Sequence, residues 1–208
     1  MARTDTRERM ITTAAKLMQR QGYHGTGLNQ ILAEAKAPKG SMYFHFPGGK
    51  DQLAAAAIAA SADYVLGVLR RSEASAAAEA LDAYIAGVVD ALEARDFATG
   101  CPIATVALEV APAGGEIGEA CALAFERLIA HVAGWLERDG LAPDEAADRA
   151  FMIYAAIEGR SPSPRRGAPA NPSTACGGAS ETCCHRPAAL GWRRSDRRGQ
   201  GTGGESLG

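Results

Sequence analysis

The chain has 208 residues, of which 47% are hydrophobic and 22% are charged, which is typical of a globular protein with a buried core. A formal net charge of −2 excludes a protein that is strongly basic or acidic as a whole. Along the chain, however, Lys and Arg number eight against three Asp and Glu in residues 1–50, six against eighteen in residues 51–159, and eight against three in residues 160–208. A basic beginning on an acidic middle indicates a protein that holds phosphates at one end, unless charge merely varies along solvated helices.

Neither the composition nor the beginning of the chain predicts a membrane protein. We expect no apolar run long enough to cross a bilayer, and the first residues, MARTDTRERM, are charged with no apolar segment behind them. A cytoplasmic protein with no membrane partner is therefore expected. Reduced cysteines fit this location, because Cys101 and Cys121 stand alone and only Cys176, Cys183 and Cys184 cluster.

The first 50 residues contain three predicted helices. Residues 7–21 place Met10, Ala14 and Met18 at helical spacing, and Gly22 marks the end of this helix. A short amphipathic stretch follows at residues 28–35, and another begins at Pro38, which suits a first helical turn. Two short helices joined by so tight a turn predict a helix-turn-helix.

Longer helices are predicted for the middle of the chain. One runs from Lys50 to about Arg71, and others span about 75–95, 102–111, 115–139 and 143–159, separated by glycine- and proline-containing breaks. No stretch shows the period-two alternation of a strand, so we expect an all-α fold. The last of these helices carries a stripe made of Ala147, Ala150, Phe151, Tyr154 and Ile157.

The stretch GYHGTGLNQILAEAKAPKGSMYFHFPGGKDQLAAA, in which Tyr43, His45, Phe46 and Lys50 have a specific spacing, resembles the DNA-binding head of the TetR family. Gly100-Cys101-Pro102-Ile103 before an alanine-rich helix is similar to the LmrA/YxaF-like branch, and the resemblance covers residues 6–159. It implies a helix-turn-helix domain at 1–50 and a helical ligand-binding and dimerisation domain at 51–159. There the last helix of the family is missing, and the stripe of helix 143–159 would face that helix and a partner subunit.

This resemblance implies a ligand-responsive transcriptional regulator of the repressor type. Its partners would be palindromic operator DNA, a small apolar inducer and a second copy in a homodimer, with no cofactor and no enzymatic activity. Two alternatives stay open: a nonspecific nucleic-acid-binding protein that uses the head and the basic tail, and a small-molecule carrier with a vestigial head.

The chemistry of the head predicts which face contacts DNA. A helix that starts at Pro38 offers backbone N–H groups and a positive dipole end, and its first turn brings charge from Lys39 and close approach at Gly40. Tyr43 and His45 would reach phosphate, with Phe44 and Phe46 turned inward, although the two polar residues could instead be an ordinary half-buried aromatic and a surface histidine. The predicted DNA-binding residues are Thr26, Gly27, Asn29, Gln30, Lys39, Gly40, Ser41, Tyr43, His45 and Lys50. Base specificity is assigned to residues 39–41, with Asn29 or Gln30.

Two positions depart from the pattern of the family. Gly27 stands where the second helix is usually capped by Ser or Thr. Lys36 occupies a turn position that calls for a left-handed residue, commonly Gly, at a cost of about 1 kcal/mol.

The body of the chain offers larger or polarizable side chains among many alanines, a mixture that can line an apolar cavity. The predicted ligand-binding residues are Tyr84, Phe97, Cys101, Cys121, Phe125, His131, Trp135, Phe151, Met152 and Tyr154, with plain packing as the alternative for each. No pairing of nucleophile with base, glycine-rich phosphate loop or metal-ligand spacing is recognisable here, which favours a sensor over a catalyst.

Residues 160–208 change composition abruptly: they lack Val, Ile, Met, Phe and Tyr and hold five of the ten prolines, which predicts a disordered tail. Cys176, Cys183, Cys184 and His185 do not have the spacing of a zinc site. When the frame moves by one base, serine TCN codons and cysteine TGY codons give codons for Leu, Val, Ile, Phe or Met. The tail is therefore predicted to be the missing final helix written out of frame from near Gly159. A genuine basic tail with nonspecific affinity for nucleic acid is the alternative.

Overall fold

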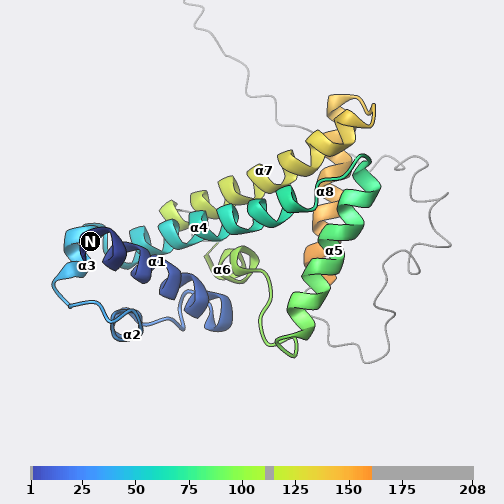
Figure 1. Cartoon of the computed structure of the whole chain (residues 1–208). Helices are drawn as coiled ribbons and strands as arrows, with labels where there is room; N and C mark the ends of the chain where they lie inside the picture. Colours follow the sequence, from blue (N-terminus) through green and yellow to red (C-terminus); the bar gives the residue numbers. More distant parts are fainter. Residues whose placement is uncertain (1, 111–114, 161–208) are drawn as a thin grey trace, which may run out of the picture. The chain divides into compact units, whose positions relative to one another are not determined.

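The computed structural model describes residues 2–110 and 115–160, and all regular structure in these two ranges is helical, which confirms the all-α expectation. The helices, shown in Figure 1, are α1 (Ala2–Gln21), α2 (Leu28–Glu34), α3 (Ser41–His45), α4 (Gly49–Arg71), α5 (Ala77–Glu93), α6 (Pro102–Val110), α7 (Gly115–Arg138) and α8 (Pro143–Arg160). These bounds follow the predicted ones closely except for the first helix, which begins at Ala2 and not at residue 7, and for the third helix. The predicted tail and its cysteine cluster lie outside the described residues.

Helices α1 and α2 begin and end where local backbone chemistry requires. Met10, Ala14 and Met18 of α1 are fully buried, and the helix ends because Gly22 has a φ of 73°, a left-handed conformation that glycine adopts without strain. Gly27 precedes α2 without a side-chain cap, as predicted. The left-handed residue expected after α2 is also confirmed, because Lys36 has a φ of 51°.

Helix α3 corrects two expectations. It begins at Ser41, since residues 38–40 form a turn in which the Ser41 N–H donates to the Pro38 carbonyl at 2.9 Å, so the first helical turn is not at Pro38. Met42 and Phe46, four residues apart, share the buried face. Phe44 lies halfway between them and therefore points outward, with 60% of its surface exposed, so its assignment to the core was wrong.

Helix α4 is the element on which α1, α6 and α7 all pack. Leu53, Ala57, Ile58 and Leu66 form much of its buried face. Among the described residues, α4 is the single helix whose length and composition would allow it to cross a bilayer. The expectation that the chain has no such run was therefore wrong. A core helix meets the same criterion, and the packing of α4 on three neighbours is that of a core helix.

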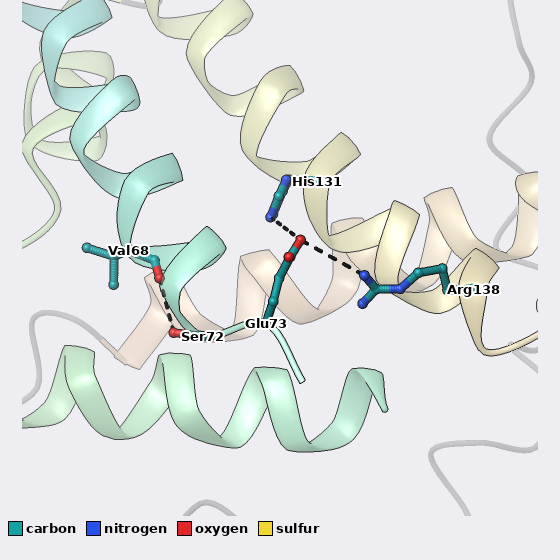
Figure 2. A network of polar contacts seen from close by, with 5 residues as sticks. All are labelled: Val68, Ser72, Glu73, His131 and Arg138. Atoms are coloured by element: carbon teal, nitrogen blue, oxygen red, sulfur yellow. Dashed lines mark hydrogen bonds and ion pairs between the residues drawn. The ribbon is translucent and has the colours of Figure 1, made fainter. Parts of the chain in front are cut away.

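Ion pairs join α7 to α4 and to the turn that follows it. Arg127 of α7 pairs with Asp63 of α4 at 2.7 Å. Figure 2 shows Glu73, just after α4, between His131 and Arg138 of α7, with its Oε1 4.0 Å from His131 Nε2 and 3.9 Å from an Arg138 nitrogen. These groups are partly exposed, so the pairs fix the register of α4 and α7 more than they add stability.

Helices α5 and α8 complete the body. The first N–H of α5, at Ala77, receives no cap from its own neighbours and instead donates to the Asp139 carboxylate at 2.8 Å, which places a negative charge at a helix N-terminus. On α8 the expected stripe divides: Ala150 and Tyr154 are buried in the chain's own core, whereas Phe151 is 59% exposed. Its neighbour Met152, which is outside the stripe, is 67% exposed.

Candidate DNA-binding face and ligand cavity

The predicted DNA-binding residues of α2, α3 and the turn between them are mostly accessible. Gly27, Asn29, Lys39, Gly40 and Tyr43 are exposed, while Gln30, Ser41, His45 and Lys50 are half-buried. In the described part of the chain, the side chains of Asn29, Lys39 and Tyr43 have no hydrogen bond or ion pair. Their donors are therefore available to phosphate or base edges.

Some polar groups of this face already have partners. The Ser41 hydroxyl donates to the Pro38 carbonyl at 2.6 Å, and the Gln30 amide bonds both Gln21 and Glu34. Thr26 corrects a prediction: it is fully buried and its hydroxyl donates to the Gly22 carbonyl at 2.6 Å. Its side chain therefore holds the α1–α2 loop together and offers no exposed atom to DNA.

Lys50 is held against the α1–α2 loop. Its ammonium donates to the Tyr23 carbonyl at 2.8 Å and lies 4.1 Å from the centre of the Tyr23 ring, a cation–π contact. Burial lowers the pKa of Lys50, while Asp51 and Glu109 oppose the change. The Tyr23 hydroxyl donates to Asp51, and burial together with that carboxylate raises the pKa of Tyr23 to about 12. A phosphate contact from Lys50 stays a prediction.

The body contains a cavity of about 340 Å³ between α4, α5, α8 and the segment that leads into α6. Its wall is mostly apolar, with Val65 and Val68 from α4, Val88 from α5 and Ile157 from α8. A volume of this order is at the lower end of what small-molecule sites occupy. The cavity is therefore large enough for a compact organic ligand.

Three of the predicted ligand-binding residues, Tyr84, Cys101 and Tyr154, line this cavity. Burial raises the pKa of the Cys101 thiol to about 12, so the thiol stays protonated near neutral pH. Burial likewise raises the pKa of both tyrosines, and each is hydrogen-bonded to the other. These three groups act as neutral polar contacts in an apolar wall.

The other predicted ligand-binding residues lie elsewhere. Phe97 is in the α5–α6 loop, where it and Asp96 have φ values of 55° and 49°. Phe125 packs edge-on against Tyr154, with ring centres 6.1 Å apart, and so supports the wall from behind. The remaining ones do not line the cavity: Cys121 and Trp135 are buried, His131 is half-buried, and Phe151 and Met152 are exposed on α8.

The lining also contains residues that the sequence analysis missed. Besides apolar side chains such as Val65 and Val88, they include the polar or charged groups Tyr64, Arg71, Arg95, Thr99 and Glu158. Glu158 carried a readable signal, because a carboxylate four residues after Tyr154 shares a helix face with an aromatic of the expected pocket. The two arginines carried none, since exposed arginines at helix ends are common.

Two hydrogen bonds join the cavity wall and α6 to the end of α1. The Gln19 amide donates to the carbonyl of Gly100, a lining residue, at 2.7 Å. At the other end of α6, Glu109 accepts from the His24 backbone N–H at 2.8 Å. Glu109 also lies so close to Gly22 that a Cβ there would be 1.6 Å from its Oε1. The head thus rests on both ends of α6.

A helix-turn-helix head attached to a helical body that contains a cavity is the architecture of a one-component DNA-binding regulator. Residues 10–57 match the bacterial regulatory proteins of the tetR family, and residues 77–161 match the C-terminal domain of LmrA/YxaF-like transcriptional regulators. The HTH-type transcriptional regulator LmrA of Bacillus subtilis is 33% identical over 161 residues, covering 76% of this chain and 86% of that protein. YxaF of the same organism is 36% identical over 160 residues, covering 76% and 84%.

The chain therefore belongs to the TetR family of transcriptional regulators, which are DNA-binding proteins and not enzymes. Solved structures agree on the fold: a TetR-family regulator from Agrobacterium tumefaciens has a TM-score of 0.67 at 20% identity, covering 84% of this chain and 94% of that one. The reduced form of NemR from Escherichia coli has a TM-score of 0.63 at 23% identity, covering 74% and 84%.

Proposed function

We propose that this regulator is a ligand-responsive repressor. Its head would bind a palindromic operator as part of a homodimer in the cytoplasm, and a small apolar inducer in the cavity would release it. The repressor assignment is supported by DhaR of Mycobacterium sp., a transcriptional repressor that is 27% identical over 169 residues and matches 74% of this chain and 79% of its own length.

The observation that carries this proposal is the hydrogen bond from Gln19 to Gly100, because it ties the last turn of α1 to a residue of the cavity wall. Gly100 is followed at once by Cys101 and Pro102, which also line the cavity and open α6. A ligand that repositions this segment would change the support of the head at Gln19 and, through α6, at His24. Differential binding to two head positions is what an inducer requires.

The homodimer is supported by the exposed side of the last helices. Phe151 and Met152 of α8 and Leu123 of α7 are large apolar side chains that the chain's own core leaves exposed. A second copy that covered them would place two heads at a fixed spacing, which a palindromic operator needs.

Footprinting on the DNA upstream of the coding region, with the full chain and at moderate salt, tests the proposal. Protection of a palindrome with half-sites about 10 base pairs apart, or a multiple of that distance, is the expected result. Diffuse protection that disappears with rising salt would overturn specific regulation in favour of nonspecific binding.

A further inference from the structure

The cavity contains a carboxyl oxygen that lacks a hydrogen-bond donor. Glu158 lines the cavity, and its Oε2 is buried with no hydrogen-bond partner among the described residues. The hydroxyl oxygen of Thr99, also in the lining, is buried without a partner as well. Buried polar atoms in folded proteins are nearly always satisfied, so two unmet groups in one apolar cavity indicate a ligand that satisfies them.

No cationic side chain compensates Glu158. Burial raises its pKa, and the groups that oppose this rise are the Cys101 thiol and the Tyr154 hydroxyl, both uncharged donors. Arg71 and Arg95 line the same cavity but are exposed, and neither offsets the desolvation of the carboxyl. The cavity wall therefore offers a negative or hydrogen-bond-accepting group with no positive partner among the described residues.

We propose that the ligand is a small apolar molecule bearing a protonated amine, whose N–H groups donate to Glu158 Oε2 and to the Thr99 hydroxyl oxygen. This inference rests on the proposed function, in which the cavity is the inducer site. The rings of Tyr84 and Tyr154 line the cavity beside Glu158 and suit a cation, because the face of an aromatic ring attracts positive charge. The apolar body of the ligand would lie among Val65, Val88 and Leu92.

Other ligand classes fit these groups less well. A carboxylic acid held by Arg71 and Arg95 would leave Glu158 Oε2 and the Thr99 hydroxyl oxygen without partners and would bring a second negative charge into the cavity. A neutral alcohol would supply one hydrogen bond but no charge. A charge-assisted hydrogen bond is stronger than a neutral one, so the amine should be preferred over the alcohol.

The test compares three probes with one apolar body: phenylbutylamine, phenylbutanol and phenylbutanoate, titrated calorimetrically into the full chain at neutral pH. The amine should bind about 10-fold or more tightly than the alcohol, and the carboxylate most weakly. Glu158→Gln should abolish the advantage of the amine while leaving the affinity for the alcohol unchanged. Glu93→Gln, at an exposed carboxylate of α5 outside the lining, is the matched control and should keep it.

The ranking in the unmodified chain needs no variant, so a folding defect of Glu158→Gln would not hide the result. The proposal is overturned if the alcohol or the carboxylate binds as tightly as the amine, if a folded Glu158→Gln binds the amine unchanged, or if none of the probes binds. Operator affinity measured in the same samples distinguishes failure of the amine proposal from failure of the proposed function. If the alcohol binds as tightly as the amine and lowers operator affinity, the proposed repressor function stands and only the preference for an amine is contradicted. If the amine binds but operator affinity is unchanged, the proposed release of DNA by the ligand is contradicted.

Discussion

The side-chain amide of Gln19, in the last turn of α1, donates a 2.7 Å hydrogen bond to the backbone carbonyl of Gly100 in the cavity wall. Eighty-one residues of sequence separate the two partners. Because the acceptor is a main-chain atom of the segment that opens α6, the contact responds to backbone movement there and not to the identity of one side chain.

Gln19→Met should retain the length of the side chain but lose this bond. We expect the free energy of unfolding to fall by about 0.5–1.5 kcal/mol, the usual contribution of one hydrogen bond, with operator affinity retained. An inducing probe should then release DNA less effectively. Gln21→Met, whose amide bonds only within the head, is the control for denaturant melts and DNA titrations. If the inducing probe releases DNA equally well from both variants, the proposed role of Gln19 is contradicted.

Gly22→Ala should destabilise the chain for two reasons. The φ of 73° costs an L-residue about 1–2 kcal/mol, and the added Cβ would displace the Glu109 carboxylate from the His24 N–H. Gly118→Ala provides the contrast, because that glycine is within α7 and a Cβ there meets nothing within 4 Å. It should stabilise the chain by about 0.5–1 kcal/mol. If both variants shifted the melting temperature in the same direction, the requirement for glycine at position 22 would be refuted.

Tyr43→Ala and His45→Ala should each weaken operator binding by about 3- to 10-fold, because each removes a polar contact to DNA from the face of α3. The melting temperature of Tyr43→Ala should stay the same, since Tyr43 is 65% exposed and makes no polar contact within the described residues. Tyr64→Ala removes an equally exposed tyrosine, at 67%, from α4 in the body. It should leave DNA affinity intact in fluorescence-anisotropy titrations without ligand. Unchanged affinity in both head variants would place the DNA-binding face elsewhere.

The stability of the chain should fall with pH in the range where His131 titrates. Burial lowers the pKa of His131, and Glu73 opposes this change. Arg70 and Arg138 lower the pKa of His131 further; Figure 2 shows Glu73 and Arg138 beside the histidine. The folded state therefore binds fewer protons than the unfolded state, so stability is fully present above the ordinary histidine pKa of about 6.5 and is lost as the pH falls through the lowered value. His131→Gln should flatten this decline in thermal melts, whereas His24→Gln, at an exposed histidine, should keep it. A wild-type slope in His131→Gln would exclude the histidine as its cause.

Moving the reading frame near Gly159 should produce a more stable dimer. Phe151 and Met152 are large and exposed on α8, and burying such a side chain contributes about 1.5–3 kcal/mol. Sequencing the coding DNA across residues 155–208 tests the frame directly. Sedimentation and calorimetry of the frame-corrected chain should show a dimer with a higher melting temperature. If the chain as printed is already an equally stable dimer, the frameshift hypothesis is wrong.

The sequence by itself determined the helices, the helix-turn-helix and the family, because these depend on local periodicity, on glycine and proline punctuation and on the fixed spacing of Tyr43, His45 and Lys50. Through the resemblance to the family it also predicted the left-handed backbone at Lys36. Phe44 shows the limit of such reasoning. The sequence pattern predicts this aromatic residue in the core, and only the burial of Met42 and Phe46 on the opposite face of α3 turns it outward.

The cavity could be predicted only in part. Tyr84, Cys101 and Tyr154 were recognisable as large or polarizable groups among alanines, but His131 and Trp135 met the same criterion and lie outside the lining. Which face of α7 and α8 turns toward α5 depends on helix packing, and packing is decided by contacts between residues far apart in sequence. For the same reason only the tertiary structure could bring Glu158 and Thr99 together in one apolar wall, and Gln19 to Gly100.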